Sequence, residues 1–227
     1  MKNKIIILMM ALMIVGLLAG SAAASDWEAV GGISITNVTL DKWNSTIDDL
    51  NNLVASNFQG SISTSNIEKM DNIDKVPMLY LGAKKKVSDK WTANIQYEHI
   101  FGAVETNFDS AVGKGSAEID VALNGLALLA DYELSERWTT GGGVAFYKGT
   151  KDKNFEGQAF AASGLVDEKV DLDAVSYRWG IGYKRQFADS WDFNAGIDYL
   201  YLEMDDEDEG DVYSNGFSYK AGLTYSF

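Results

Sequence analysis

The chain offers very few side chains that could carry out chemistry. Its 227 residues include no cysteine and a single histidine, His99, which excludes a cysteine nucleophile, a thiolate metal centre and a cage of paired histidines. An imidazole can act as the general base for a serine nucleophile, but the neighbours of His99 are Glu98, Ile100 and Phe101. The alternation of side chains described below places His99 on an apolar face. The sequence therefore predicts no catalytic residue, no metal ligand and no cofactor.

An acidic segment near the end of the chain is a second candidate for chemistry. Seven of the nine residues from Glu203 to Asp211 are acidic, which is typical of calcium-binding loops. If Asp205 opens such a loop, Gly210 falls correctly at the sixth position, but Gly216 takes the last position, where a bidentate glutamate is required. We therefore expect a solvated acidic loop. Loose bridging of divalent cations to anionic headgroups is the alternative.

Composition narrows the class of protein further. Lys and Arg number 19 against 33 Asp and Glu, and the resulting formal charge of −14 argues against nucleic acid as a partner. With 46% apolar and 12% aromatic residues the chain is not typical of a disordered protein. One domain, or at most two, is expected from the length.

Residues 1–24 have the three parts of a secretory signal peptide. Two lysines precede an uninterrupted apolar run over 5–19, and small residues follow it. The run is shorter than the roughly 20 residues of a transmembrane helix. We therefore expect export of a single domain that covers 25–227.

The exported part alternates with a period of two residues, which is typical of strands with two unlike faces. Trp91, Ile95 and Phe101 share one face of such a strand, while Thr92 and Gln96 lie on the other. The same alternation recurs near 191–201 and at the C-terminus. These segments predict strands rather than helices.

A short motif separates neighbouring strands at three places. It consists of an apolar, a small, an acidic and a polar residue followed by Trp, and it occurs at 87–91, 134–138 and 187–191. Each copy fits a tight hairpin, and longer connections are expected at 37–75, 102–116, 149–169 and 203–211. The predicted strands cover 26–36, 76–87, 91–101, 117–134, 138–148, 170–187, 191–202 and 212–227. Eight antiparallel strands with short turns at one end predict an all-β, up-and-down barrel.

Two local features modify this pattern. In the fourth strand the apolar residues change phase after Leu123, and a one-residue bulge near Asn124 and Gly125 would keep them on one face. In the first long connection, at 37–75, apolar residues recur at helical spacing, which predicts an amphipathic helix over about 40–55. This helix could rest on the barrel mouth or the outer leaflet, or act as a lid over a ligand entrance.

Several features indicate that the apolar face meets lipid and the polar face lines the lumen. The step from Trp91 to Phe101 corresponds to roughly 25 Å along a tilted strand, the height of a lipid-facing band. Aromatic residues at strand ends are expected to form an interface girdle: Trp27, Trp91, Trp138, Trp191 and Phe227. Five bases and five acids are expected to pair in a neutral lumen network: Lys84, Lys86, Glu98, Asp131, Glu133, Arg178, Lys184, Asp192, Asp198 and Lys220.

The last strand resembles the assembly signal of bacterial outer-membrane proteins, a polar residue, a glycine and two aromatic or apolar residues ending in Phe. Lys220, Gly222, Tyr225 and Phe227 occupy these positions. With the signal peptide and the alternation, the chain resembles small outer-membrane barrels such as the OmpA membrane domain, OmpX and OmpW. The resemblance implies a monomer in the bacterial outer membrane, with outer-membrane lipid and the barrel-assembly machinery as partners.

Eight strands enclose an interior that side chains can fill, so we expect a structural or surface-interaction role. Thr139, Gly141, Gly143 and Ala145 leave the lumen face of the fifth strand nearly bare. Large neighbours could fill this gap, or it could form a narrow passage. OmpW-like passage of small apolar compounds is therefore the first alternative. A lipid-modifying enzyme that uses His99 is a weaker one, because the close His-x-Ser spacing of one such family is absent.

Overall fold

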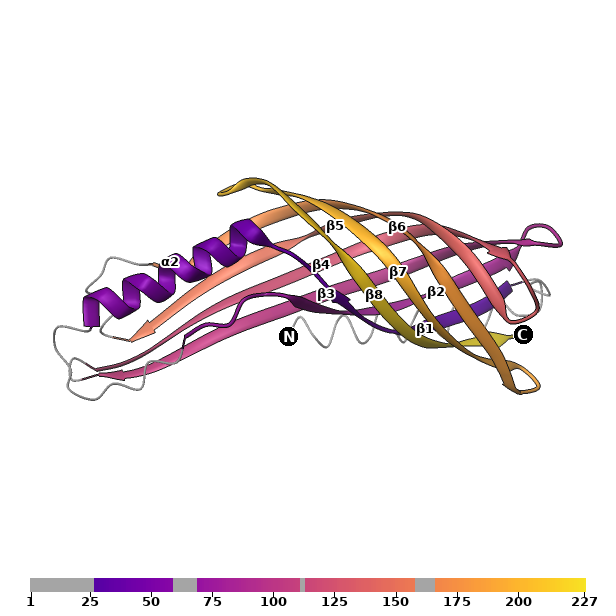
Figure 1. The fold of residues 1–227 in the computed structure, drawn as a ribbon, viewed down its shortest axis with the longest axis horizontal. Coiled ribbons are helices and arrows are strands. Elements are labelled where there is room, and N and C mark those ends of the chain that lie inside the picture. Colours follow the sequence, from indigo (N-terminus) through magenta and orange to yellow (C-terminus); the bar gives the residue numbers. More distant parts are fainter. Residues whose placement is uncertain (1–26, 59–68, 111–112, 158–165) are drawn as a thin grey trace.

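The computed structural model describes residues 27–58, 69–110, 113–157 and 166–227, and the predicted signal peptide lies outside these ranges. Eight strands pair in chain order, and β1 closes on β8 through an antiparallel ladder that includes Gly32 and Gly222. The elements are β1 (Trp27–Asn37), α2 (Asp41–Phe58), β2 (Lys75–Lys86), β3 (Trp91–Ser110), β4 (Gly113–Glu133), β5 (Trp138–Gly157), β6 (Glu168–Ala188), β7 (Trp191–Asp206) and β8 (Gly210–Ser226). The predicted up-and-down barrel with one loop helix is confirmed (Figure 1).

The lower part of the barrel, near the short turns, turns its apolar side chains outward. Ile95, Ile197 and Leu223 expose 47%, 49% and 43% of their surface, whereas polar residues such as Gln96 are buried on the inner face. An exposed apolar band on a closed barrel is the lipid-facing belt of a transmembrane barrel. None of the helices among the described residues is long and apolar enough to span a membrane.

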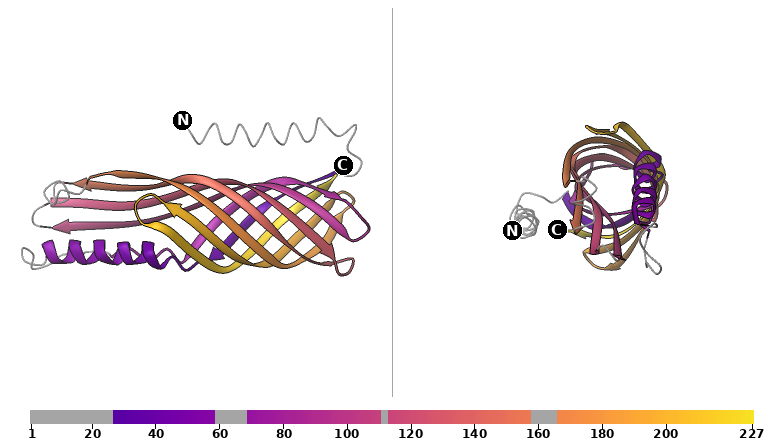
Figure 2. Two further views of the ribbon diagram at one scale, coloured as in Figure 1. Left: turned by 90° about the horizontal axis from the view of Figure 1, so that it is seen from above. Right: turned by 90° about the vertical axis from the view of Figure 1, so that its left-hand side faces the viewer.

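The strands from β3 to β6 are longer than predicted, because they continue beyond the belt. Each has 20 or 21 residues, against the roughly 10 that a tilted strand needs to cross the hydrocarbon. Within the predicted loops, residues 102–110, 113–116, 149–157, 168–169, 203–206 and 210–211 are strand. We call the part of the barrel beyond the belt the extension. There α2 runs beside the long strands, roughly along the barrel axis (Figure 2).

Apolar side chains face outward in the belt and inward in the extension. This inversion explains why the predicted bulge in β4 is wrong. The register of β4 with both neighbours is continuous through Asn124 and Gly125, and the irregularity lies instead between Gln186 and Ala188. Leu123 faces inward and is buried, while Leu126 faces outward and is exposed. Both orientations are favourable, because the extension meets water outside and has an apolar core inside.

Candidate functional site

The first part of the candidate site is a layer of polar side chains that crosses the lumen. Arg178 Nη1 and Nη2 donate to Glu98 Oε1 and Oε2 at 2.8 and 2.6 Å. The Tyr147 hydroxyl donates to Glu98 Oε2 at 2.5 Å and accepts from Arg178 Nη2 at 2.9 Å. Glu98 is completely buried. Arg178 of β6 and Glu98 of β3 thus form a bidentate, charge-assisted ion pair, a strong kind of hydrogen-bonded contact, and Tyr147 of β5 bonds to both residues.

A cavity of about 340 Å³ lies below this layer. Its wall includes Lys86, Glu133 and Lys184, which are adjacent to the hairpins, so the cavity reaches the short-turn end of the barrel. On the bare face of β5, Thr139 and Gly141 line the cavity, whereas Gly143 and Ala145 are not part of its wall. The wall also includes charged residues such as Lys84 and Asp131. The cavity is therefore polar, and it occupies only the lower part of the lumen.

The remaining predicted lumen charges fall into two groups. Lys220 pairs with Asp198 at 2.6 Å, Lys184 lies 4.0 Å from Glu133, and Lys84 pairs with Glu28, which the sequence analysis did not name, at 3.1 Å. Lys86, Asp131 and Asp192 form no ion pair within the described part of the chain. Because side chains alternate along a strand and Trp27 faces outward, its neighbour Glu28 could have been predicted to face the lumen.

Above the polar layer the interior is apolar. Inward residues of the extension, among them Leu123, Leu172, Met204 and Val212, are almost completely buried, and Ile47 of α2 packs into the same cluster. We call this cluster the upper core. Leu123, Leu172 and Val212 lie in predicted strands, whose apolar side chains were expected to face lipid. Met204 was expected in a loop, and the upper core was therefore not predicted.

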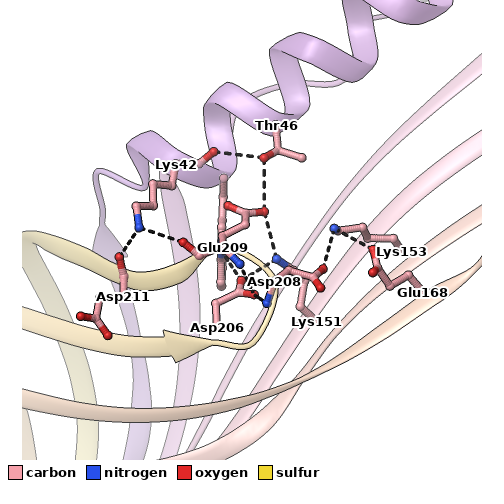
Figure 3. A network of polar contacts seen from close by, with 10 residues as sticks. Lys42, Thr46, Lys151, Lys153, Glu168, Asp206, Asp208, Glu209 and Asp211 are labelled. Atoms are coloured by element: carbon pink, nitrogen blue, oxygen red, sulfur yellow. Dashed lines mark hydrogen bonds and ion pairs between the residues drawn. The ribbon is translucent and has the colours of Figure 1, made fainter.

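A second polar cluster joins α2 to the strands at the top of the upper core (Figure 3). Asp206 accepts hydrogen bonds from Trp43 Nε1 at 2.9 Å and from Lys151 Nζ at 2.5 Å. Its other oxygen accepts from the backbone N–H groups of Asp208 and Glu209. Lys151 and Asp206 are both buried, although β5 and β7 carry them from distant parts of the sequence. We call this cluster the Asp206 latch.

The latch corrects part of the prediction of a solvated acidic loop, because Asp206 is buried and Glu209 half-buried, whereas the other five acidic side chains of the segment are exposed. Glu209 accepts from Lys151 at 3.0 Å, and Asp208 accepts from Lys153 at 3.1 Å. Burial alone would raise the pKa of the Asp206 carboxyl, but its hydrogen bonds, above all with Lys151, hold that pKa below its ordinary value. Within the described ranges, no group of three or more His, Cys, Asp or Glu side chains is arranged to hold a metal ion.

Further contacts hold the start of α2 against the hairpin between β7 and β8. Lys42 Nζ donates to the backbone carbonyls of Glu209 and Asp211 at 2.9 and 2.6 Å. The Thr46 hydroxyl donates to Glu209 Oε1 at 3.2 Å. The hairpin thus contacts α2 through both its backbone and its side chains (Figure 3).

The predicted girdle residues lie at the short-turn rim and face outward. The rings of Trp91, Trp138 and Trp191 contact neighbouring tyrosines at centroid distances of 5.1, 5.1 and 4.8 Å. Trp27 lies under the Lys85 ammonium, and Phe227 packs edge-on against Tyr225. Amphipathic rings in this position anchor a barrel at the membrane interface.

His99 lies at the opposite edge of the belt. Its Nδ1 is 2.9 Å from Asn124 Oδ1, which also accepts a hydrogen bond from the Tyr97 hydroxyl, and its ring stacks on Phe101 at 5.5 Å. These contacts fit an interfacial side chain.

The four residues of the predicted assembly signal divide between the two faces of β8. Lys220 points into the lumen and Tyr225 and Phe227 point outward. Gly222 is required by packing: a Cβ there would lie 2.3 Å from the Tyr80 hydroxyl oxygen and 2.5 Å from a backbone carbonyl oxygen of β1. Close packing therefore requires glycine here, whether or not assembly does.

No protein-family model and no curated protein matches the chain. Solved structures resemble it in fold. The attachment invasion locus protein Ail of Yersinia pestis is 13% identical, with a TM-score of 0.46 over 88% of this chain and 99% of that one. Neisserial surface protein A is 10% identical, with a TM-score of 0.46 over 88% and 97%.

The outer membrane protein OprG from Pseudomonas aeruginosa is 15% identical, with a TM-score of 0.42 over 89% and 96% of the two chains. Independently of these likenesses, the chain itself forms a closed barrel of eight antiparallel strands with an exposed apolar belt and a tryptophan girdle. This architecture is that of a small bacterial outer-membrane barrel.

Proposed function

We propose that this protein is a surface-interaction barrel of the bacterial outer membrane, and that its extension binds the partner. The observation that carries the proposal is the continuation of β3 to β6 far beyond the belt as paired strands. Paired strands packed on a core are much more rigid than the loops that usually cover such barrels. A rigid projection suits the presentation of a fixed surface to a partner.

The charge on the outer face of the extension indicates the kind of partner. The register sets Asp173 opposite Asp205 and Asp205 opposite Asp211, so three carboxylates form a row across β6, β7 and β8. Lys148 pairs with Asp173 at 3.0 Å. Like charges directly opposite each other are destabilising, and a cationic partner would relieve this repulsion. We therefore propose a partner with a basic surface.

A second acidic face lies on β3 and β4. Glu105 is opposite Glu118 in the register, and the negative charge of Asp120 raises the pKa of the Glu118 carboxyl, with further contributions from burial and from Glu105. This face provides a control for the row on β6 to β8, because it also sets carboxylates opposite each other, on other strands; Glu105 is exposed and Glu118 half-buried.

The experiment measures binding of polylysine, a simple cationic probe, to the full chain in nanodiscs. We expect saturable, salt-sensitive binding, and no binding of the polyanion heparin. Changing Asp205→Asn together with Asp211→Asn should weaken polylysine binding roughly two- to tenfold, and more than Glu105→Gln together with Glu118→Gln does. Equal effects of the two pairs would contradict a specific cationic surface on β6 to β8.

Passage of small apolar compounds is the second candidate, and the upper core favours it. The cavity below the polar layer and the apolar cluster above it are stacked along one axis, with Arg178 bordering the cavity and Tyr147 buried beside it. Passage would require both the Glu98–Arg178 layer and α2 to move. Uptake of a small hydrocarbon into proteoliposomes at a rate above that of protein-free vesicles would favour this candidate over a purely interacting barrel.

A further inference from the structure

The two described ends of the segment between β1 and β2 meet where these strands end. The backbone N–H of Val38 donates to the carbonyl of Asp74 at 2.9 Å, directly beyond the last paired residues of β1 and β2. α2 lies within this segment, so among the described residues the Val38–Asp74 bond forms the base through which the helix joins the wall. Such a base allows a segment to move as a body.

The helix and the described part of its return segment are tied to each other. The Asn44 side chain accepts from the backbone N–H of Ile73 at 2.9 Å, and the Asn51 side chain both donates to and accepts from the backbone of Met70. These bonds lie within the 38–74 segment. They would survive a movement of this segment away from the strands.

The contacts between α2 and the barrel are of a different kind. α2 has no partner in a strand ladder, so its hydrogen bonds to the barrel involve side chains. Trp43, Lys42 and Thr46 form these bonds with the hairpin between β7 and β8. Asp206 binds Trp43 of α2 and Lys151 of β5 with the same oxygen. One buried carboxylate therefore joins the helix, the wall and the hairpin.

The position of α2 shows what its movement would expose. β1, β2, β7 and β8 are shorter than β3 to β6, and α2 runs beside the long strands where the short strands have ended (Figure 2). Its Ile47 is completely buried in the upper core. The helix thus completes the wall of the extension and covers that core.

We infer that α2 is a displaceable section of the wall, held shut by the Asp206 latch. With the latch intact the upper core is closed to the extracellular side. Breaking the latch frees α2 to move away from the long strands, and the upper core becomes accessible to solvent while the barrel below stays folded. This device is independent of the cationic partner proposed above.

The absence of cysteine from the sequence makes a thiol-labelling test straightforward. Ile47→Cys places one thiol under α2, Ala127→Cys places one in the buried barrel wall, and Ser45→Cys places one on the exposed face of α2. Each single variant of the full chain is folded in nanodiscs and reacted with a water-soluble maleimide. For a buried thiol the labelling rate is the open fraction multiplied by the rate for an exposed thiol such as Ser45→Cys.

Adding Asp206→Asn should increase the labelling rate of Ile47→Cys by about tenfold or more, since the latch loses a buried, charge-assisted bond. The rate for Ala127→Cys should not change. Trp43→Phe keeps an aromatic ring but removes the N–H donor, so it should increase the Ile47→Cys rate by roughly threefold to tenfold. This milder variant serves if Asp206→Asn does not fold.

Two results would overturn the inference. One is an Ile47→Cys rate that neither latch variant changes, which would mean that Asp206 does not hold the helix. The other is a parallel increase at Ala127→Cys, which would mean that the barrel loosens as a whole and that α2 is no separate unit.

Discussion

The polar layer of the lumen makes a prediction in which two variants of one ion pair differ. Arg178→Met would leave Glu98 completely buried, with only the Tyr147 hydroxyl as a hydrogen-bond donor. Glu98→Gln would leave the Arg178 guanidinium, which borders the cavity and can be solvated from it. Removing one partner of a buried pair costs about 3–5 kcal/mol. We therefore expect Arg178→Met to fall at the upper end of that range and Glu98→Gln at or below its lower end.

The assay is reversible unfolding by urea in lipid vesicles, followed by tryptophan fluorescence, with the free energy of unfolding extrapolated to zero denaturant. The double variant Glu98→Leu with Arg178→Met is the control, because replacing a buried pair with apolar residues is often neutral. It should be more stable than Arg178→Met alone. Equal costs for the two single variants, or costs below about 1 kcal/mol as for exposed pairs, would refute the claim that Glu98 is desolvated.

Three other changes test separate parts of the structure. Gly222→Ala should lower the free energy of unfolding by about 1–3 kcal/mol through overpacking against Tyr80, and a defect in folding into pure lipid vesicles would show that packing, not recognition, requires the glycine. The lowered pKa of Asp206 means that its contribution is complete above the ordinary carboxyl pKa and is lost as pH falls through the folded value. The labelling rate of Ile47→Cys divided by that of Ser45→Cys, a ratio that cancels the loss of thiolate in acid, should thus rise only in acid, and a rise near neutral pH would contradict the assignment. Trp138→Ala should cost about 1 kcal/mol in the same urea assay, since the ring loses its contact with a tyrosine, and an unchanged midpoint would argue against an anchoring role.

The strands could be predicted from the sequence because the belt imposes a strict rule on it. Lipid outside and paired charges inside require alternation, so Ile95 and Gln96 differ in kind as well as in position. The Trp motif then marks the hairpins, and β3, β5 and β7 begin at Trp91, Trp138 and Trp191 as expected. Here the local pattern and the environment agree.

The extension could not be predicted in the same way, because there the polar side chains face outward and the apolar side chains face inward. Beyond the belt, alternation continues with acids outside and apolar residues inside, and a search for the belt pattern therefore ends β3, β5 and β7 too early. Asp206 is an example of an inward residue that was not predicted. It continues the parity of Leu202 and Met204, both buried, so alternation could have placed it inside, but the density of acids around it indicated a loop. Its partner Lys151 is 55 positions away, and only the register brings the two together.

The inversion of polarity also fixes how deep the barrel sits in the bilayer. Sliding the molecule toward the periplasm would draw the outward carboxylates of the extension, such as Glu203 and Asp205, into hydrocarbon. Sliding it the other way would lift belt residues such as Ile197 into water. Both displacements are costly, so the sequence of outward residues works as a depth mark, and the height of the projection above the lipid is set before any partner arrives.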